Sequence, residues 1–203
     1  MNILAFDTTI KNAIIFLIQG KQSKTITLDS DEKQSEHLML KIDKFLKDNN
    51  VELSEIDAFG VVVGPGSFTG IRVGIATVKA FAYALNKPVV ALNRFEIVSS
   101  EIGIGQYLCE CTSNSCYFAN IKNGKIMEVG TIDNSEITDK NNLFVIREEH
   151  FFDNQAYNLN VLTNYKDLCC SKFINLATKK KFLSPEPYYI QVSQAERNLE
   201  KKK

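Results

Sequence analysis

The chain has 203 residues, a formal net charge of zero, 44% hydrophobic residues and 24% charged residues. This length can bury a core in one large domain or two small ones, and the neutral balance favours neither a nucleic-acid nor a membrane surface as partner. No apolar run approaches the ~20 residues of a membrane span, and no signal peptide is visible. Five cysteines without a secretory context therefore predict a reducing cytoplasm, with the thiols buried.

The first half of the chain alternates between strand-like and helix-like patterns. Strands are predicted first at 2–8, 12–19 and 23–28, where apolar runs or alternation are followed by turn residues. The period then changes, which predicts helices at 33–47, 68–85 and 94–101, separated by strands at 57–63 and 89–92. This order of elements is that of the ribonuclease-H-like fold, which actin-like ATPases use in duplicate.

The second half carries a weaker pattern. Its predicted strands cover 107–112, 116–121, 126–132, 143–147, 160–163 and 188–192, with one helix at 165–177. We therefore expect an α/β protein with two ribonuclease-H-like (actin-like ATPase) lobes, residues 1–104 and 105–203. The second lobe is expected to be reduced, because roughly 100 residues leave little room for full helices.

A glycine-rich loop joins the strand at 57–63 to the helix at 68–85, with the sequence Gly64-Pro65-Gly66-Ser67-Phe68-Thr69-Gly70-Ile71-Arg72-Val73-Gly74. Gly64 and Gly66 allow backbone angles that a side chain forbids, and Ser67 is placed to cap the helix. Such a loop suits an anion, or it is a tight turn that brings the helix close to the sheet. With Asp7 and Thr8, which end the first strand, these residues are the candidate cleft residues.

Three kinds of catalysis find little support. A nuclease needs an acid at the end of the central strand, where this chain has glycine and proline. An actin-like ATPase needs a second phosphate turn and an adenosine loop, but residues 109–115 and 162–165 contain no glycine. Nucleophilic or metal-dependent catalysis by histidine is the third kind. The two histidines, His37 and His150, form no H-x-x-x-H pair, and no aspartate or cysteine lies at a helical spacing that would orient His37 as a base. The sequence thus predicts no catalytic residue, cofactor or metal, and an active ATP-dependent phosphotransferase or hydrolase of this superfamily stays as the alternative.

A helix that packs on a sheet with one of its sides keeps its other side polar, and the helix at 68–85 is too apolar to fit this description. Arg72, Lys79 and Tyr83 share one narrow sector, and the rest of the surface is small or apolar. Either the C-terminal half of the chain or another protein must cover its second side. The candidate contact residues come from this helix and the one before it: Leu38, Met39, Ile42, Ile71, Arg72, Ile75, Val78, Lys79, Ala82 and Tyr83.

The glycine loop resembles the signature of the TsaB family, which is required for N6-threonylcarbamoyladenosine at position 37 of tRNAs that read ANN codons. Ile3-Leu4-Ala5-Phe6-Asp7-Thr8, Ser35-Glu36 and Glu186-Pro187-Tyr188-Tyr189-Ile190-Gln191 resemble further family motifs. The resemblance implies a non-catalytic scaffold that pairs with the transferase TsaD through the helices of the N-terminal lobe, and that the ATPase TsaE joins. It also implies that the chain can form a homodimer when TsaD is absent.

The sequence departs from the family pattern at three places. Gln34 stands where the family has histidine, Gln191 replaces a closing arginine, and Cys111-Thr112-Ser113 replaces an aspartate-alanine-arginine strand. These departures concern ligand contacts of the second lobe and leave the scaffold role as the expectation. Direct contact of tRNA with the lysine triplets at 179–181 and 201–203 stays open.

Overall fold

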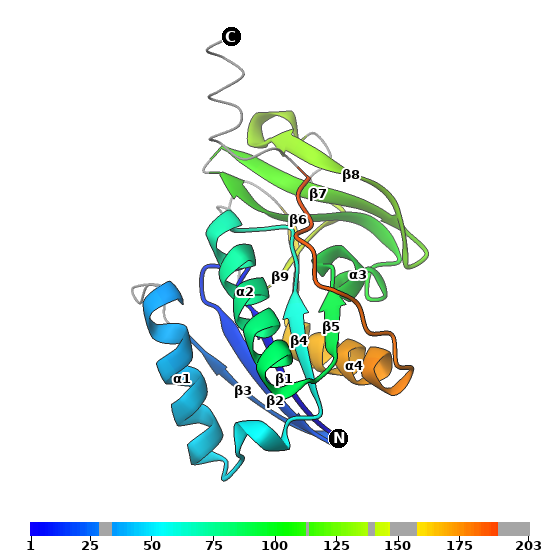
Figure 1. The fold of residues 1–203 in the computed structure, drawn as a ribbon. Coiled ribbons are helices and arrows are strands. Elements are labelled where there is room, and N and C mark those ends of the chain that lie inside the picture. The colour runs from blue at the N-terminus through cyan, green and yellow to red at the C-terminus, as the bar shows by residue number, and fades with distance from the viewer. Residues whose placement is uncertain (29–33, 113, 138–140, 147–157, 191–203) are drawn as a thin grey trace.

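The computed structural model describes residues 1–28, 34–112, 114–137, 141–146 and 158–190. Figure 1 shows two sheets with helices packed on the first, and each sheet has five strands of mixed direction. The predicted α/β architecture with two lobes of one topology is confirmed.

The first sheet, sheet A, has the strand order β3-β2-β1-β4-β5. Its strands are β1 (Asn2–Asp7), β2 (Ile14–Gln19), β3 (Gln22–Thr27), β4 (Ala58–Val62) and β5 (Val89–Leu92). The first three strands are antiparallel, and β4 and β5 continue the sheet in parallel with β1. The central strands are covered on both faces, which explains their nearly continuous apolar sequences.

Helices cover both faces of sheet A (Figure 1). One face carries α1 (Gln34–Asp48) and α2 (Phe68–Leu85), with the short 3₁₀ helix η1 (Leu53–Glu55) between them in the chain. The other face carries α3 (Arg94–Ser99) and α4 (Tyr165–Thr178). Side chains of β1 alternate between the two cores, because Leu4 and Phe6 pack with the first helix pair and Ile3 and Ala5 with the second.

The second sheet, sheet B, repeats this topology with the order β10-β9-β6-β7-β8. Its strands are β6 (Ile104–Thr112), β7 (Ser115–Lys122), β8 (Lys125–Asp133), β9 (Leu143–Ile146) and β10 (Leu159–Leu162). As in sheet A, three antiparallel strands are followed by two parallel ones. Within the described part of the β8–β9 connection, the only helix is η2 (Asn134–Glu136), where sheet A has the whole of α1. The lobe is reduced at this crossover.

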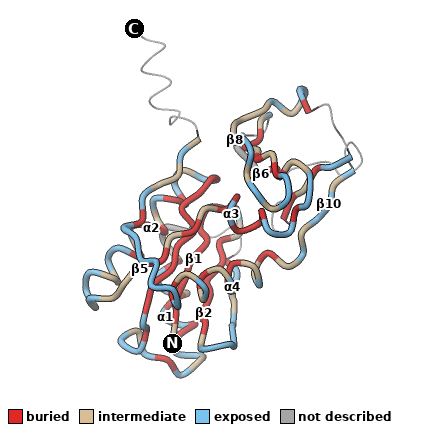
Figure 2. The backbone as a smooth tube through the Cα atoms, turned by 90° about the vertical axis from the view of Figure 1, so that its right-hand side faces the viewer, coloured by how far each residue is buried: buried red, intermediate tan, exposed pale blue. Residues whose placement is uncertain are grey.

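The two lobes share a core, because α4 follows sheet B in the chain but packs on sheet A. The ring of Phe173 lies 6.1 Å from that of Phe16, and a Cβ on Gly60 would lie 2.7 Å from Phe173. Beside this contact, Phe95 of α3 meets Tyr107 of β6 edge-on at 6.0 Å. Figure 2 shows the buried backbone concentrated in β1, β2 and the helices beside them.

One predicted strand is wrong. Residues 188–190 belong to no sheet, and 191–192 lie outside the described residues. The stretch runs as an extended segment across sheet A and forms one backbone hydrogen bond there, from Tyr188 N to Val63 O at 2.8 Å. Pro185 and Pro187 directly before the stretch lack amide donors, so no ladder extends back from Tyr188 along the segment.

Candidate functional site

The glycine loop is a tight turn packed against the chain itself. Gly64 and Gly66 adopt φ angles of 127° and 149°, which side chains avoid, and the peptide bond between Gly64 and Pro65 is cis. A Cβ on Gly66 would collide with the carbonyl of Thr9, and one on Gly64 would lie 2.6 Å from the carbonyl of Tyr188. Ser67 caps α2 as predicted, since its hydroxyl accepts from the Gly70 amide at 3.1 Å.

Asp7, at the end of β1, lies in a closed hydrogen-bond cluster. Its carboxylate Oδ1 accepts from the amide and the hydroxyl of Thr9, at 2.9 and 2.5 Å, and Oδ2 accepts from the Tyr165 hydroxyl at 2.6 Å. The Arg94 guanidinium donates to the same Thr9 hydroxyl. Asp7, Arg94 and Tyr165 have no exposed surface, and Thr9 has 2%. Both carboxylate oxygens are therefore occupied by groups of the chain itself.

Burial sets the protonation of the neighbouring acids. Removal from water raises the pKa of Tyr165 well above its ordinary value, and the nearby Asp7 charge raises it further. The same two causes, in the same order, raise the pKa of Cys169. Both groups stay protonated at neutral pH, so Tyr165 remains a hydrogen-bond donor to Asp7.

Of the five candidate cleft residues, four are enclosed. Asp7, Thr8, Gly64 and Gly66 are buried, and the Thr8 hydroxyl donates to the Gly70 carbonyl at 2.6 Å. Only Ser67 is exposed, and its side chain serves the helix cap. The turn alternative for the glycine loop accounts for these contacts without a bound anion.

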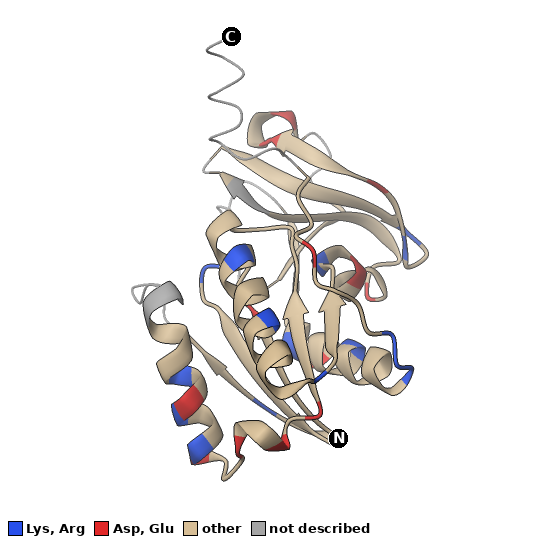
Figure 3. Ribbon diagram, in the orientation of Figure 1, with Lys and Arg blue, Asp and Glu red and all other residues tan. Residues whose placement is uncertain are grey.

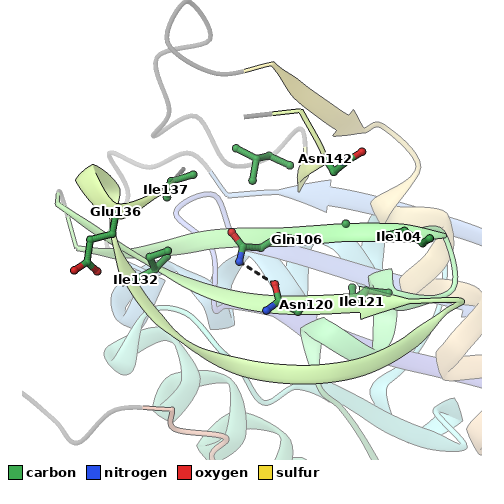
Figure 4. Close-up of a pocket in the computed structure, with 10 residues that line it drawn as sticks. Ile104, Gln106, Asn120, Ile121, Ile132, Glu136, Ile137 and Asn142 are labelled. Atoms are coloured by element: carbon green, nitrogen blue, oxygen red, sulfur yellow. Dashed lines mark hydrogen bonds between the residues drawn. The ribbon is translucent and has the colours of Figure 1, made fainter. Parts of the chain in front are cut away.

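A hollow of about 330 Å³ lies on sheet B (Figure 4). Two of its polar side chains are engaged with each other, because Gln106 donates to Asn120 at 2.9 Å, and Asn120 donates in turn to Glu128 outside the hollow at 2.8 Å. In Figure 4 the Glu136 carboxylate points away from the other lining residues. The hollow thus gathers no set of converging reactive groups. Among the described residues, no cluster of three or more His, Cys, Asp or Glu could hold a metal ion.

The structure divides the predicted contact residues of the two helices into an inner and an outer set. The inner set is buried in the core against sheet A, with at most 6% exposure, and comprises Leu38, Ile42, Ile71, Ile75 and Val78. These five side chains face the core and offer no surface to another protein. The outer set holds Arg72, Lys79, Tyr83 and Met39, with Ala82 half-buried at its edge. The contact prediction is thereby restricted to the outer set.

The outer face of α2 is a smooth strip with one large side chain. Ala76, Ala80 and Ala84 are exposed along it, and Tyr83 stands out from it with 92% of its surface exposed. Arg72 and Lys79 are the only charged residues of α2, seen as its basic bands in Figure 3. We name this strip, from Arg72 to Ala84, the α2 face.

The C-terminal segment covers one flank of the α2 face. Cover by the C-terminal half of the chain was one of the two alternatives that the apolar sequence of this helix predicted, and cover by another protein was the other. Arg72 donates to the Tyr189 hydroxyl at 3.1 Å, and Lys79 pairs with Glu186 at 3.3 Å.

Sequence reasoning missed the roles of Arg94 and Tyr165 in the Asp7 cluster, because their hydrogen bonds join residues that are 85 and 158 positions apart in the chain. The only sequence signal for the contacts of Glu186 and Tyr189 with α2 was the family motif at 186–191.

By length and composition alone, α2 is also the one helix among the described residues that could cross a membrane. The core helix of a folded domain passes the same test, and 33% of this stretch is buried inside the molecule. Its buried stripe packs on sheet A, so this property adds nothing to the site.

Two sheets of one topology, each with three antiparallel strands followed by two parallel ones, define the class of fold, which is actin-like and ribonuclease-H-like. The structure of YeaZ from Pseudomonas aeruginosa is similar over 93% of this chain and 100% of that one, with a TM-score of 0.67 and 17% identity. At this identity the likeness shows the fold alone.

Sequence comparison gives the particular relatives. The family model for TsaD, tRNA N6-adenosine threonylcarbamoyltransferase, matches residues 28–111. The tRNA threonylcarbamoyladenosine biosynthesis protein TsaB of Buchnera aphidicola is 32% identical over 101 residues, which cover 49% of this chain and 46% of that protein. The tRNA N6-adenosine threonylcarbamoyltransferase of Brachyspira hyodysenteriae is 44% identical over 61 residues, or 30% of this chain and 18% of that one. The resemblance to TsaB is confirmed, and the chain spans about half the length of the TsaB relative that it matches.

Proposed function

We propose that this chain is a non-catalytic scaffold subunit for N6-threonylcarbamoyladenosine formation at position 37 of ANN-decoding tRNAs. It acts in the cytoplasm by binding TsaD through the α2 face and the adjoining outer residues of α1, and TsaE joins the larger complex. The observation that carries this proposal is the α2 face itself, with Tyr83 92% exposed in a strip of alanines. Exposed aromatic side chains flanked by small residues are typical anchors of protein interfaces.

The Asp7 cluster supports the non-catalytic part of the proposal. In actin-like ATPases the aspartate that ends the first strand faces the nucleotide cleft. Here its two oxygens are taken by Thr9 and Tyr165 inside a fully buried cluster. Releasing Asp7 for a metal-bound water would leave buried polar groups unpaired, at about 1–3 kcal/mol each. The chain is therefore built to keep this position closed.

The relatives support the pathway. Their names assign them to threonylcarbamoyladenosine biosynthesis and threonylcarbamoyl transfer, and the residues that match the TsaD family model include both α1 and α2. A transferase role for this chain itself is the second candidate, favoured by that family match. The other alternative is an active ATP-dependent phosphotransferase or hydrolase.

A reconstituted reaction separates the three. Threonylcarbamoyl transfer to tRNA is measured with this chain alone, with TsaD alone, and with both, each with and without TsaE. We expect no transfer by this chain alone and a gain when it is added to TsaD. Transfer by this chain alone would establish the transferase alternative, and ATP turnover by the isolated chain with magnesium would establish the phosphotransferase or hydrolase alternative.

A further inference from the structure

The segment from Phe182 to Ile190, here called the strap, runs antiparallel along α2. At one end of α2 the rings of Phe68 and Tyr189 stack at 4.6 Å, and further along Lys79 pairs with Glu186. Beyond the other end of α2, the Leu183 amide donates to the Val89 carbonyl at 3.0 Å. The strap therefore flanks α2 from Phe68 to Lys79 and lies beside the start of β5, and Figure 1 shows it crossing the same side of sheet A.

The strap is fixed in place by groups that face inward. The Tyr188 amide donates to Val63 O at the end of β4, and the Tyr188 ring meets Phe95 edge-on at 6.5 Å. Pro185 is buried between the two backbone contacts. These anchors hold the strap from the side of the sheet. Tyr189 and Glu186 also contact α2, whereas Leu183 and Phe182 stay exposed and can meet another protein.

Large apolar side chains gather on the outward side of the strap. Leu183 is 63% exposed, Tyr189 39% and Phe182 38%. Glu186 is 73% exposed and Lys79 46%, and such a solvated pair contributes only about 0–1 kcal/mol to the fold. The strap therefore adds apolar area and a charge beside the α2 face.

The size of a stable interface requires such an addition. The α2 face covers 13 of the 18 residues of α2, from Arg72 to Ala84, so it is about 20 Å long and ~10 Å wide, or roughly 200 Å². A stable complex buries about 800 Å² on each partner. The α2 face needs surface on both flanks, where α1 lies on one side and the strap on the other.

We propose that the strap is a direct part of the docking surface and that its occupant is the TsaD-type chain, so this inference rests on the proposed function. The matched region of the TsaD model spans α1 and α2, so such a partner carries a related helix pair. Two related helix pairs can pack about an approximate twofold axis, where each presents the same surface to the other. A segment that flanks α2 on this chain then contacts the partner's helices.

Equilibrium binding to purified TsaD tests the strap with a matched control. Leu183→Asp places a charge on the outward side of the strap, and Met127→Asp does the same at a residue 65% exposed on β8 of the other lobe. We expect Leu183→Asp to raise Kd at least about tenfold and Met127→Asp to change it less than about twofold. Thermal unfolding of both variants should match the parent chain. Unchanged binding by Leu183→Asp would overturn the proposal.

Two further variants separate this inference from the proposed function. If Tyr83→Asp abolishes binding while Leu183→Asp does not, the strap proposal fails and the α2 face stands. If the parent chain itself does not bind TsaD, both fail. The swap Lys79→Glu with Glu186→Lys restores the pair between α2 and the strap with its charges reversed. We expect the double variant to bind TsaD more weakly than the parent chain does. Binding equal to that of the parent chain would show that Glu186 acts only through its pair with Lys79, and it would contradict a direct contact of Glu186 with TsaD.

Discussion

At the scale of single residues, the decisive group is the Asp7 carboxylate. A buried carboxylate is costly unless donors surround it, and here Thr9 and Tyr165 supply three hydrogen bonds. Tyr165 comes from the second half of the chain, so one side chain both closes the cleft position and ties α4 to β1. The hydrogen bond from Tyr165 to Asp7 can therefore be tested by measuring the free energy of unfolding.

Tyr165→Phe should lower the free energy of unfolding by about 1–3 kcal/mol, because one oxygen of a buried charge loses its donor while the ring still packs. Tyr83→Phe is the control, since that ring is 92% exposed, and should change stability by less than about 0.5 kcal/mol. Urea unfolding followed by circular dichroism gives both numbers. Equal stability of the two variants would contradict the closed cluster.

Stability should also fall in alkaline solution. Tyr165 and Cys169 have pKa values raised in the folded state, from ordinary values of 10.0 and 9.0. Their stabilising contribution is complete below the unfolded pKa and is lost as pH rises above it towards the folded pKa. Each such group lowers the free energy of unfolding by about 1.4 kcal/mol per pH unit within that window. The fall should begin near pH 9, and Cys169→Ala should make it shallower; an identical slope would contradict the account.

At the scale of elements, α2 owes its position to small residues on its inner side. Gly74 lies so close to β1 that a Cβ there would collide with the Thr8 hydroxyl. This close approach lets Ile71, Ile75 and Val78 reach the core beneath the helix. The outer strip can then be almost featureless except for Tyr83.

Gly74→Ala tests this packing because helix propensity and packing have opposite signs. Alanine favours an isolated helix by about 1 kcal/mol, whereas overpacking costs about 1–3 kcal/mol. We expect a net loss of up to about 2 kcal/mol and weaker docking through a displaced α2. Gly103→Ala has nothing within 4 Å of the new Cβ and should be neutral. A stabilised Gly74→Ala variant would show that α2 has room to move.

Local patterns predicted most elements, because alternation and helical periodicity report which side of an element is buried. The helix cap at Ser67 and the turn at the glycine loop followed from the same local chemistry. The position of the strap could not be predicted in this way. Its apolar residues resemble a strand in the sequence, and only its contacts with sheet A show that it joins no sheet. The inner and outer sets of α2 could be separated only after the position of sheet A was fixed.

At the scale of the molecule, the two lobes are not independent in packing. α4 follows sheet B in sequence and buries Phe173 against sheet A, and the strap then returns to α2. The strap can therefore lie beside the α2 face only when the second half of the chain is folded onto the first.

Residues 1–104 alone should therefore fail to fold cooperatively. Without α4, one face of sheet A around Ala5, Phe16 and Gly60 would be open to water. We expect this fragment to bind a hydrophobic dye and to unfold without a sharp transition, whereas residues 1–190 should unfold cooperatively. A cooperative 1–104 fragment would show that the lobe is complete without α4.

The scaffold claim is tested most directly by calorimetry, which measures how tightly the parent chain and the Tyr83→Asp variant each bind TsaD. We expect a stoichiometric complex for the parent chain and at least about a 30-fold loss of affinity for the variant, with the same thermal midpoint. No complex with the parent chain, or equal affinity for both, would contradict it.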